Sequence, residues 1–194
     1  MESKVSRLFV AIALPDAVRA LLMAAQRELM PLLPLKSAAW SQPDSMHLTL
    51  RFLGNVESTR IPELSQQLGA GLAGFGEFDV VCERLGCFPD LRSPRVVWAW
   101  VHDADEHLVR LHRRVNQLVQ DFSKQLAAER FVGHITLARP RQIKRPDAER
   151  LAQFVARAAT RRFGDWHVPS VTLFCSQLSA TGARYAELSH AHLR

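Results

Sequence analysis

The stretch MHLTLRF spans residues 46–52, and GHITLAR spans residues 133–139 later in the chain. Both stretches contain the same order of His, an aliphatic residue, Thr and Leu. Successive side chains of a β-strand point to opposite faces of its sheet. Each stretch therefore predicts a strand with one aliphatic, buried face and one face that carries a histidine and a threonine.

In the first stretch, strict alternation places His47, Thr49 and Arg51 on the same face. Leu48, Leu50 and Phe52 lie on the opposite face, which we expect to be buried. An imidazole, a hydroxyl and a guanidinium are then expected in a row along one side of the strand. This geometry makes Arg51 a candidate site residue.

In the second stretch, His134 and Thr136 share a face, and Ile135 belongs to the buried side. Arg139 nominally falls on the buried side as well. It precedes Pro140 at the end of the predicted strand, where alternation need not hold, so its orientation stays open at this point.

Two such strands side by side would bring two histidines and two threonines into one groove. One imidazole could take a proton from an attacking oxygen while the other gives a proton to a leaving oxygen, because the reference pKa of about 6.5 makes both forms available near neutrality. Threonine hydroxyls and an arginine could bind the phosphate oxygens. A single His-x-Thr on a strand is a weak signal, but its duplication favours phosphoryl transfer without a metal.

Length and composition are those of an ordinary globular protein. A chain of 194 residues fits one domain or two small lobes, and 47% hydrophobic with 23% charged residues argues against a disordered or fibrous protein. The 25 Lys and Arg exceed the 19 Asp and Glu, for a net charge of +6, which favours anionic partners without identifying one.

Three cysteines, Cys82, Cys87 and Cys175, are too few for a disulfide framework, and none forms a CxxC pair. The apolar run at 7–14 is strand-like and is followed at once by Asp16, unlike a signal peptide. No stretch approaches the length of a membrane-spanning helix. We therefore expect a reduced, cytoplasmic protein that does not bind a membrane.

Apolar periodicity predicts strands and helices in both halves of the chain. Strands are expected at 7–14, 38–42, 46–54, 77–88, 95–101, 133–139, 167–179 and 183–189, and helices at 16–29, 59–74, 105–126 and 146–161. Strands often follow strands without a helix between them, which predicts an α+β fold with antiparallel sheets. We find no flexible linker, so the two halves are expected to pack as lobes of one body.

Two other patterns suggest sites but are better explained structurally. Residues 69–74 satisfy GxGxxG, yet they follow a helical pattern and lead into a strand, the reverse of a dinucleotide-binding turn. His102, His107 and His112 recur every five residues, about 140° apart on a helix, so they are assigned to a solvated helix surface. His190 and His192 are assigned to a frayed tail.

The paired HLTL and HITL strings resemble those of the two-histidine phosphoesterase superfamily. Within it, RLFVAIALP, HLTLRFLG, GHITLAR and LFCSQLSATGARY are similar to the bacterial and archaeal RNA 2′,3′-cyclic phosphodiesterases, historically called 2′-5′ RNA ligases. The similarity spans residues 7–185. It implies one bilobal domain over 1–194, with two pseudo-symmetric α+β lobes, each an antiparallel sheet flanked by helices, around a central cleft.

The resemblance also implies a reaction and roles. The reaction is metal-independent opening of a 2′,3′-cyclic phosphate to a 2′-phosphomonoester, with no cofactor. His47 would donate a proton to the departing 3′ oxygen, and His134 would activate water. Thr49 and Thr136 would hold the phosphate, and Arg139 is a candidate because relatives carry Arg after the second motif.

The resemblance also leads to expectations for two further positions, Tyr185 and Gly133. Tyr185, the single tyrosine, is expected at the rim of the cleft, where it could stack on a base. Gly133 stands where relatives often carry Pro and is expected to loosen the approach to His134. The expected partner is RNA with a 2′,3′-cyclic phosphate end, or a small cyclic nucleotide, bound by a monomer.

Two alternatives remain open. The reverse reaction in the same groove could join a cyclic-phosphate end to a 5′-hydroxyl end in a 2′-5′ linkage, because by microscopic reversibility the same groups catalyse both directions. A non-catalytic RNA-binding module would bind RNA in a salt-sensitive way without opening the cyclic phosphate. The presence of both histidines and both threonines argues against the second alternative.

Overall fold

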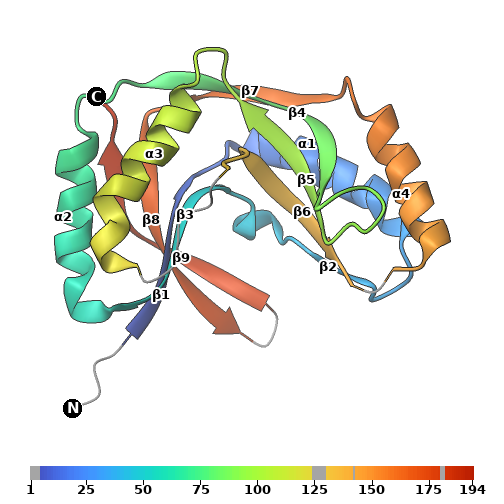
Figure 1. The fold of residues 1–194 in the computed structure, drawn as a ribbon, viewed down its shortest axis with the longest axis horizontal. Coiled ribbons are helices and arrows are strands. Elements are labelled where there is room, and N and C mark those ends of the chain that lie inside the picture. The colour runs from blue at the N-terminus through green and yellow to red at the C-terminus, as the bar shows by residue number, and fades with distance from the viewer. Residues whose placement is uncertain (1–4, 124–129, 142, 180–181) are drawn as a thin grey trace.

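A computed structural model describes residues 5–123, 130–141, 143–179 and 182–194 (Figure 1). The strands are β1 (Val5–Ile12), β2 (Ala38–Trp40), β3 (Leu48–Glu57), β4 (Phe78–Phe88), β5 (Val96–His102), β6 (His134–Pro140), β7 (Arg162–Val168), β8 (Ser170–Ser179) and β9 (Gly182–His192). The α-helices are α1 (Asp16–Leu29), α2 (Ile61–Leu72), α3 (His107–Val119) and α4 (Arg145–Arg157). Short 3-10 turns are η1 (Met30–Leu32), η2 (Pro43–Ser45), η3 (Ser58–Arg60) and η4 (Gln120–Phe122).

The strands form one curled sheet in the order β7-β4-β5-β6-β3-β1-β8-β9, with β2 added beside β6. All pairings among the described strands are antiparallel, so the predicted α+β class is confirmed. The sheet divides into two lobes at the β3–β6 junction. Helices α2 and α3 pack against the lobe of β1, β3, β8 and β9, whereas α1 and α4 pack against the other lobe (Figure 1).

The lobes do not coincide with the two halves of the chain. The first half contributes β1 and β3 to one lobe, but α1 and β4 belong to the other. The second half shows the converse arrangement. Its strands β5 and β6 belong to the lobe of β4, whereas α3 and β8 belong to the lobe of β1 and β3. Each half therefore donates one helix and two strands to the opposite lobe: α1, β2 and β4 from the first half, and α3, β8 and β9 from the second. These crossings of the chain tie the two lobes together.

The junction between the lobes is narrow. Among the described residues, β3 and β6 share a single register pair, Leu48 with Ile135, and both side chains are fully buried. These are the central aliphatic residues of the two repeated motifs. The pseudo-twofold relation between the lobes therefore passes through the duplicated sequence itself.

Amphipathic patterns account for the helices. The buried positions of α1, Val18, Leu22, Ala25 and Leu29, recur at helical spacing and cover the sheet. Strand β5 alternates buried and half-buried residues along its whole length, as expected for one core face and one face toward the cleft. Among the described residues, no helix is long and apolar enough to cross a membrane.

Three predicted strands differ from the observed ones by more than two residues at an end. Strand β3 continues past Gly54, whose φ of +74° lets the chain bend without ending the strand. The predicted strand at 167–179 is two strands, β7 and β8, divided at Pro169, and most of β7 was missed. Strand β9 continues to His192, so His190 and His192 lie in a paired strand rather than a frayed tail.

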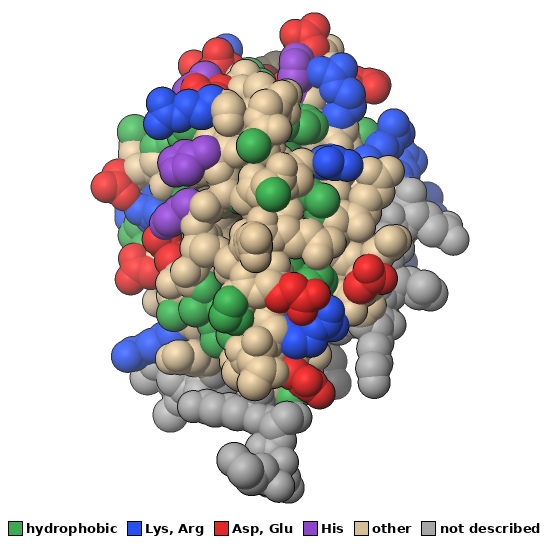
Figure 2. Space-filling model, turned by 90° about the vertical axis from the view of Figure 1, so that its left-hand side faces the viewer, with side chains coloured by type: hydrophobic (Ala, Val, Ile, Leu, Met, Phe, Trp, Pro, Cys, Tyr) green, Lys and Arg blue, Asp and Glu red, His purple; other side chains and the backbone are tan. Residues whose placement is uncertain are grey.

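Acidic and basic side chains are interspersed on the side of the molecule where α2 lies (Figure 2). Histidines and hydrophobic side chains are scattered among them. The net positive charge of the chain is therefore not gathered into one patch on this face.

Gly133 is held in a tight position just before β6. Its carbonyl accepts a hydrogen bond of 2.9 Å from the Val101 amide. A Cβ atom here would lie 2.3 Å from the Val101 carbonyl oxygen and 2.8 Å from a Leu108 methyl. The sequence expectation that Gly133 loosens the approach to His134 was wrong, because the missing side chain lets β5 and this segment approach closely.

Replacing Gly133 by Ala should lower the free energy of unfolding by about 1–3 kcal/mol, because the added methyl meets backbone that cannot move aside. Gly69→Ala is the matched control: nothing lies within 4 Å of its Cβ position in α2, and Ala should stabilise the helix by roughly 0.5–1 kcal/mol. Urea unfolding of both variants measures the difference. Equal effects of the two substitutions would contradict the packing described for Gly133.

Candidate active site

The structure brings the two repeated motifs to one pocket. A small cavity of about 120 Å³ at the β3–β6 junction is lined by His47, Thr49, His134 and Thr136. Ser41, Ser45, Phe52, Arg139 and Tyr185 complete its wall. Because the central residues of the motifs pair in an antiparallel register, each histidine comes beside the threonine of the other motif.

The sequence repeat includes a repeated irregularity of the backbone. On β1 and β3, Ala11 pairs with Thr49 and Val10 with Arg51, so Leu50 is an extra residue. Strands β5 and β6 show the same feature, since Trp98 pairs with Thr136 and Val97 with Ala138, which leaves Leu137 as the extra residue. A bulge of this kind resets the alternation of side chains beyond it.

The bulge at Leu50 corrects the placement of Arg51. Strict alternation put Arg51 in a row with His47 and Thr49, but beyond the bulge its side chain is 9% exposed and lines a neighbouring cavity instead. Phe52, which strict alternation placed on the buried face, is instead 49% exposed and lies on the pocket side. The prediction that Arg51 shares the groove face with His47 was therefore wrong.

The bulge at Leu137 has the opposite consequence for Arg139. Without it, Arg139 would point into the core with Ile135. With it, Arg139 is exposed and lines the small pocket beside Thr136. Arg139 is thus the residue of the second motif that is equivalent to Phe52. The bulge turns its side chain toward the pocket, which answers the question about the orientation of Arg139.

The carbonyl of Leu137 is released from the sheet by the bulge and is satisfied from α1. Gln26, buried at 6% exposure, donates from Nε2 to the Leu137 carbonyl at 2.8 Å and to the Ser41 carbonyl at 2.9 Å. The Ser41 amide donates to the same Leu137 carbonyl at 2.9 Å. These bonds fix the bulge and the Ser41 wall of the pocket together.

His47 sits in an aromatic cluster on its own lobe. Its ring stacks on Phe9 at 4.7 Å between ring centroids and meets Tyr185 edge-on at 5.2 Å. Phe174 stacks on Phe9 at 5.1 Å and lies 6.1 Å from the His47 ring. Tyr185 therefore lies at the pocket, as predicted, and part of its contact is with His47 itself.

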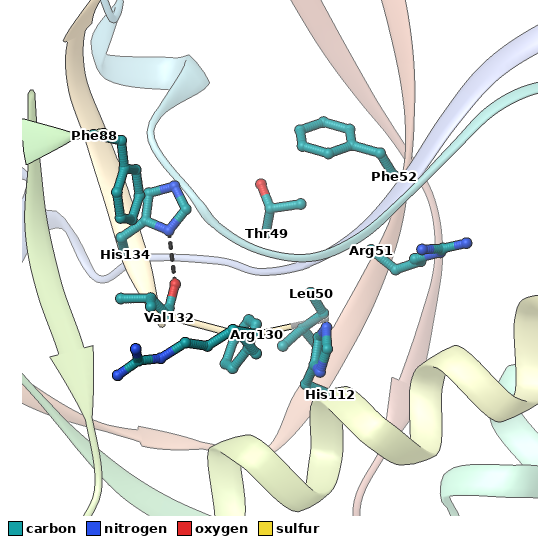
Figure 3. A pocket seen from close by; sticks show the side chains of 10 residues that line it. Thr49, Leu50, Arg51, Phe52, Phe88, His112, Arg130, Val132 and His134 are labelled. Atoms are coloured by element: carbon teal, nitrogen blue, oxygen red, sulfur yellow. Dashed lines mark hydrogen bonds between the residues drawn. The ribbon is translucent and has the colours of Figure 1, made fainter. Parts of the chain in front are cut away.

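His134 has a different aromatic wall. Phe88 meets the ring edge-on at 5.1 Å, and Trp98 lies at 6.3 Å. The Nδ1 atom of His134 donates to the Val132 carbonyl at 2.8 Å (Figure 3). This bond assigns the proton of the neutral ring to Nδ1, so Nε2 is the atom left for chemistry in the pocket.

Both histidines are anchored two residues upstream. The His47 ring donates to the backbone of Ser45, as His134 does to Val132. Burial lowers the pKa of His47 to about 4, with further lowering from His134 and Arg139, while the bond to Ser45 opposes the shift. Burial also lowers the pKa of His134, again with Arg139 adding to the effect and the bond to Val132 opposing it.

A larger cavity of about 550 Å³ adjoins the small pocket (Figure 3). The two share Thr49, Phe52 and His134. The cavity is otherwise lined by side chains from β3, the end of β4, α3 and the segment before β6: Leu50, Arg51, Phe88, His112, Arg130, Phe131 and Val132. His134 therefore borders both spaces, whereas His47 borders only the small one.

His112 is the clearest residue that the sequence interpretation misplaced. It was assigned to a solvated helix surface, but it is 7% exposed, lines the large cavity and stacks on Phe131 at 4.1 Å. The signal was present in the sequence, since His112 lies one residue after Leu111 and three before Val115, both on the buried stripe of α3.

The structural interpretation of the GxGxxG string is confirmed, whereas His102, assigned to a helix surface, is the last residue of β5. The GxGxxG string at 69–74 forms the end of α2 and the following turn. Cys82, Cys87 and Cys175 are free thiols, and burial raises the pKa of both Cys82 and Cys87 to about 12. Within the described residues, no group of three or more His, Cys, Asp or Glu side chains is arranged to hold a metal ion.

Comparison with known proteins identifies the family. Residues 12–98 and 100–185 each match the profile described as "LigT like Phosphoesterase". The chain belongs to this family. The two matches divide the chain near its middle, in agreement with the duplicated motif and bulge.

Similar proteins cover nearly the whole chain. An RNA 2′,3′-cyclic phosphodiesterase of Archaeoglobus fulgidus is 31% identical over 182 residues, 94% of this chain and 97% of that protein. Another of Thermus thermophilus is 32% identical over 97% of this chain and 90% of its own length. The crystal structure of TT0787 from Thermus thermophilus superposes with a TM-score of 0.77 at 28% identity, covering 97% and 98% of the two chains.

Stability should depend on pH through His47. Its lowered pKa means that the unfolded chain binds this proton first as the pH falls, so the contribution of His47 to the free energy of unfolding should decrease from pH 6.5 toward 4 and stay level above 6.5. His47→Gln should remove about 1–2 kcal/mol of this decrease, a value reduced for partial exposure of the ring. Chemical unfolding across this range tests the prediction; parallel curves for variant and wild type below pH 6.5 would contradict it.

Proposed function

We propose that this protein opens 2′,3′-cyclic phosphate ends of RNA to 2′-phosphomonoesters, without a metal, and that His47 and His134 are its acid–base pair. The observation that carries the proposal is the convergence of both histidines and both threonines on one small pocket. Membership of the LigT-like family, and relatives named for this activity over most of their length, support the reaction.

The proposed step is an in-line displacement at phosphorus. A water oxygen attacks phosphorus, and the bond from phosphorus to the 3′ oxygen breaks, which leaves the phosphate on the 2′ oxygen. His134 takes a proton from the water, and protonated His47 gives a proton to the departing 3′ oxygen. Nε2 of His134 is available as the base because Nδ1 carries the proton that binds Val132.

The remaining pocket groups bind the phosphate in this proposal. The hydroxyls of Thr49 and Thr136 donate to the non-bridging oxygens, and the Arg139 guanidinium offsets the charge that builds up there. Tyr185 contributes by packing edge-on against His47. Ser41 and Ser45 are further hydroxyls in the wall that the sequence interpretation did not select.

The proposed substrate is RNA with a cyclic phosphate end, or the corresponding mononucleotide, and the role is in RNA processing. One chain supplies every group named in the reaction, so we propose that a single bilobal domain acts as a monomer. The adjoining cavity of about 550 Å³ provides space next to the phosphate for the rest of a nucleotide.

His47→Ala and His134→Ala should each lower kcat on a 2′,3′-cyclic nucleotide by about 10²–10⁴-fold, because each removes one proton transfer. Phosphorus NMR with EDTA present measures ring opening and shows whether the product is the 2′-phosphate. Activity of the wild-type enzyme should persist in the chelator.

His107→Ala is the matched control, because this histidine lies on α3 against Phe78, outside both spaces. It should retain wild-type activity. Full activity of either pocket variant, with the fold verified by circular dichroism, would remove that histidine from the mechanism.

The pH profile of kcat/KM should be bell-shaped and centred below 6.5. In the free enzyme the pKa of His47 is about 4 and that of His134 is lowered, so the pH range in which one ring is protonated and the other neutral lies on the acid side of the ordinary histidine value. The bound phosphate anion favours imidazolium, so the kcat profile should lie at higher pH.

Arg139→Gln tests how much of the shift of the kcat/KM profile to low pH comes from the Arg139 charge, in addition to the larger effect of burial. Removing its charge should raise the pKa of both histidines and move the kcat/KM profile to higher pH, whatever its effect on the absolute rate. Initial rates between pH 4 and 9 measure both profiles. An optimum of kcat/KM above 6.5 in the wild-type enzyme would contradict the assignment.

A further inference from the structure

Gln26 is a polar residue on the buried face of α1. It is 6% exposed, and the other buried positions of this helix are apolar: Val18, Leu22, Ala25 and Leu29. Burying an amide costs free energy unless its polar atoms find hydrogen-bond partners, so packing alone does not account for a glutamine here. The partners of this side chain therefore indicate its role.

Both hydrogens of the Gln26 amide nitrogen are used, and each binds a different segment of the chain. Nε2 donates to the Leu137 carbonyl at 2.8 Å and to the Ser41 carbonyl at 2.9 Å. Both acceptors are carbonyl oxygens, so the atom that faces them must be the amide nitrogen. The Ser41 amide donates to the same Leu137 carbonyl at 2.9 Å, which closes a network of three bonds among α1, β6 and the residue that follows β2.

Each segment that Gln26 binds carries residues of the small pocket. Leu137 is the extra residue of the bulge in β6, with Thr136 directly before it and Arg139 two residues after it. Ser41 lines the pocket itself, whereas Gln26 lines neither this pocket nor the large cavity. Gln26 therefore binds the backbone behind the pocket without reaching a substrate in it.

The orientation of Arg139 depends on the bulge that Gln26 binds. Strand β5 pairs with Thr136 and Ala138 but leaves Leu137 out of the register, and β2 pairs with β6 over only three residues. A bulge turns the side chains beyond it to the other face, which is how Arg139 comes to line the small pocket. A buried amide that donates to the bulged carbonyl stabilises this form of the backbone.

We propose that Gln26 is a positioning residue of the small pocket: by holding the Leu137 bulge from α1, it keeps the Arg139 guanidinium at the pocket. The inference rests on the proposed function, in which Arg139 acts on the phosphate. Arg139 also lowers the pKa of both His47 and His134. If the bulge loosens, the guanidinium is at the pocket for less of the time, so both pKa values should rise and phosphate binding should weaken.

Gln26→Met removes both donors and keeps an unbranched side chain of similar length on the helix. We expect kcat/KM on a 2′,3′-cyclic nucleotide to fall by roughly 10- to 100-fold, since a small misplacement of a pocket group has effects of this size. The kcat/KM profile should move to higher pH by roughly 0.5 unit, in the same direction as in Arg139→Gln. An unchanged profile in the folded variant would overturn the proposal.

Gln26→Asn is a second variant, in case Gln26→Met does not fold. Its amide is one methylene shorter and cannot reach both carbonyls from the same place on α1. It should move the profile in the same direction, and an unchanged profile would again count against the role of Gln26.

Leu22→Val is the matched control for lost packing. Leu22 is fully buried on α1, about one helical turn before Gln26, and its side chain has no polar atom. The variant should unfold at a lower temperature than the wild type but keep the wild-type pH profile. If it moves the profile as far as Gln26→Met does, the effect comes from helix packing and the proposed role of the Gln26 amide is wrong.

A double variant tests the path from Gln26 to the histidines. If Gln26 acts through Arg139, Gln26→Met should shift the profile in the wild-type background and not in the Arg139→Gln background. A shift of the same size in both backgrounds would overturn this path, and so would the absence of any shift in Arg139→Gln itself.

NMR titration of the histidine ring protons separates this inference from the proposed reaction, because it needs no turnover. The pKa of His134 should rise in Gln26→Met and in Arg139→Gln and keep its wild-type value in Leu22→Val. If the wild-type protein opens no cyclic nucleotide while these shifts occur, the proposed function fails and the hold of Gln26 on Arg139 stands. If the protein is active and the pKa of His134 is unchanged in Gln26→Met, the reaction stands and the positioning role fails.

Discussion

The contact between Leu48 and Ile135 is the constraint on which the rest of the site depends. These two fully buried residues form the register pair that joins the lobes, and each is the central residue of a His-x-Thr motif. Because neighbours in a strand face the opposite way, burying this pair turns both histidines and both threonines into the pocket. A slip by one residue would bury the polar groups and expose the aliphatic ones.

Sequence periodicity was sufficient for the strands that carry the motifs and for the convergence of the polar pairs, since alternation and burial act on every residue in the same way. It failed where the backbone departs from regularity. The bulge at Leu50 moved Arg51 out of the pocket, and a bulge depends on pairing with another strand that the local sequence does not reveal. His112 was misplaced for another reason: histidine spacing was weighed above the apolar stripe of its helix. The exchange of one helix and two strands between the halves of the chain depends on long-range packing and was not anticipated.

The small pocket and the large cavity, which both border His134, differ in the kind of interaction that their walls offer a ligand. The small pocket is lined by hydroxyls, imidazoles and a guanidinium, which suit a compact anion. The large cavity combines aromatic and aliphatic groups with two guanidinium groups, those of Arg51 and Arg130. Its apolar surface can contribute binding free energy by burial, which the small pocket of polar groups supplies less.

Duplication makes the two halves of the site alike, so the direction of proton transfer must arise where the halves differ. Motif, bulge and the bond to the backbone two residues upstream are the same for both histidines. Their neighbours are not: three aromatic rings from one lobe enclose His47, whereas His134 opens onto the large cavity. Two residues after the extra residue of each bulge, one motif carries Phe52 and the other carries Arg139. The symmetric frame therefore aligns two equivalent imidazoles, and in the proposed mechanism their unequal surroundings set which one acts as acid and which as base.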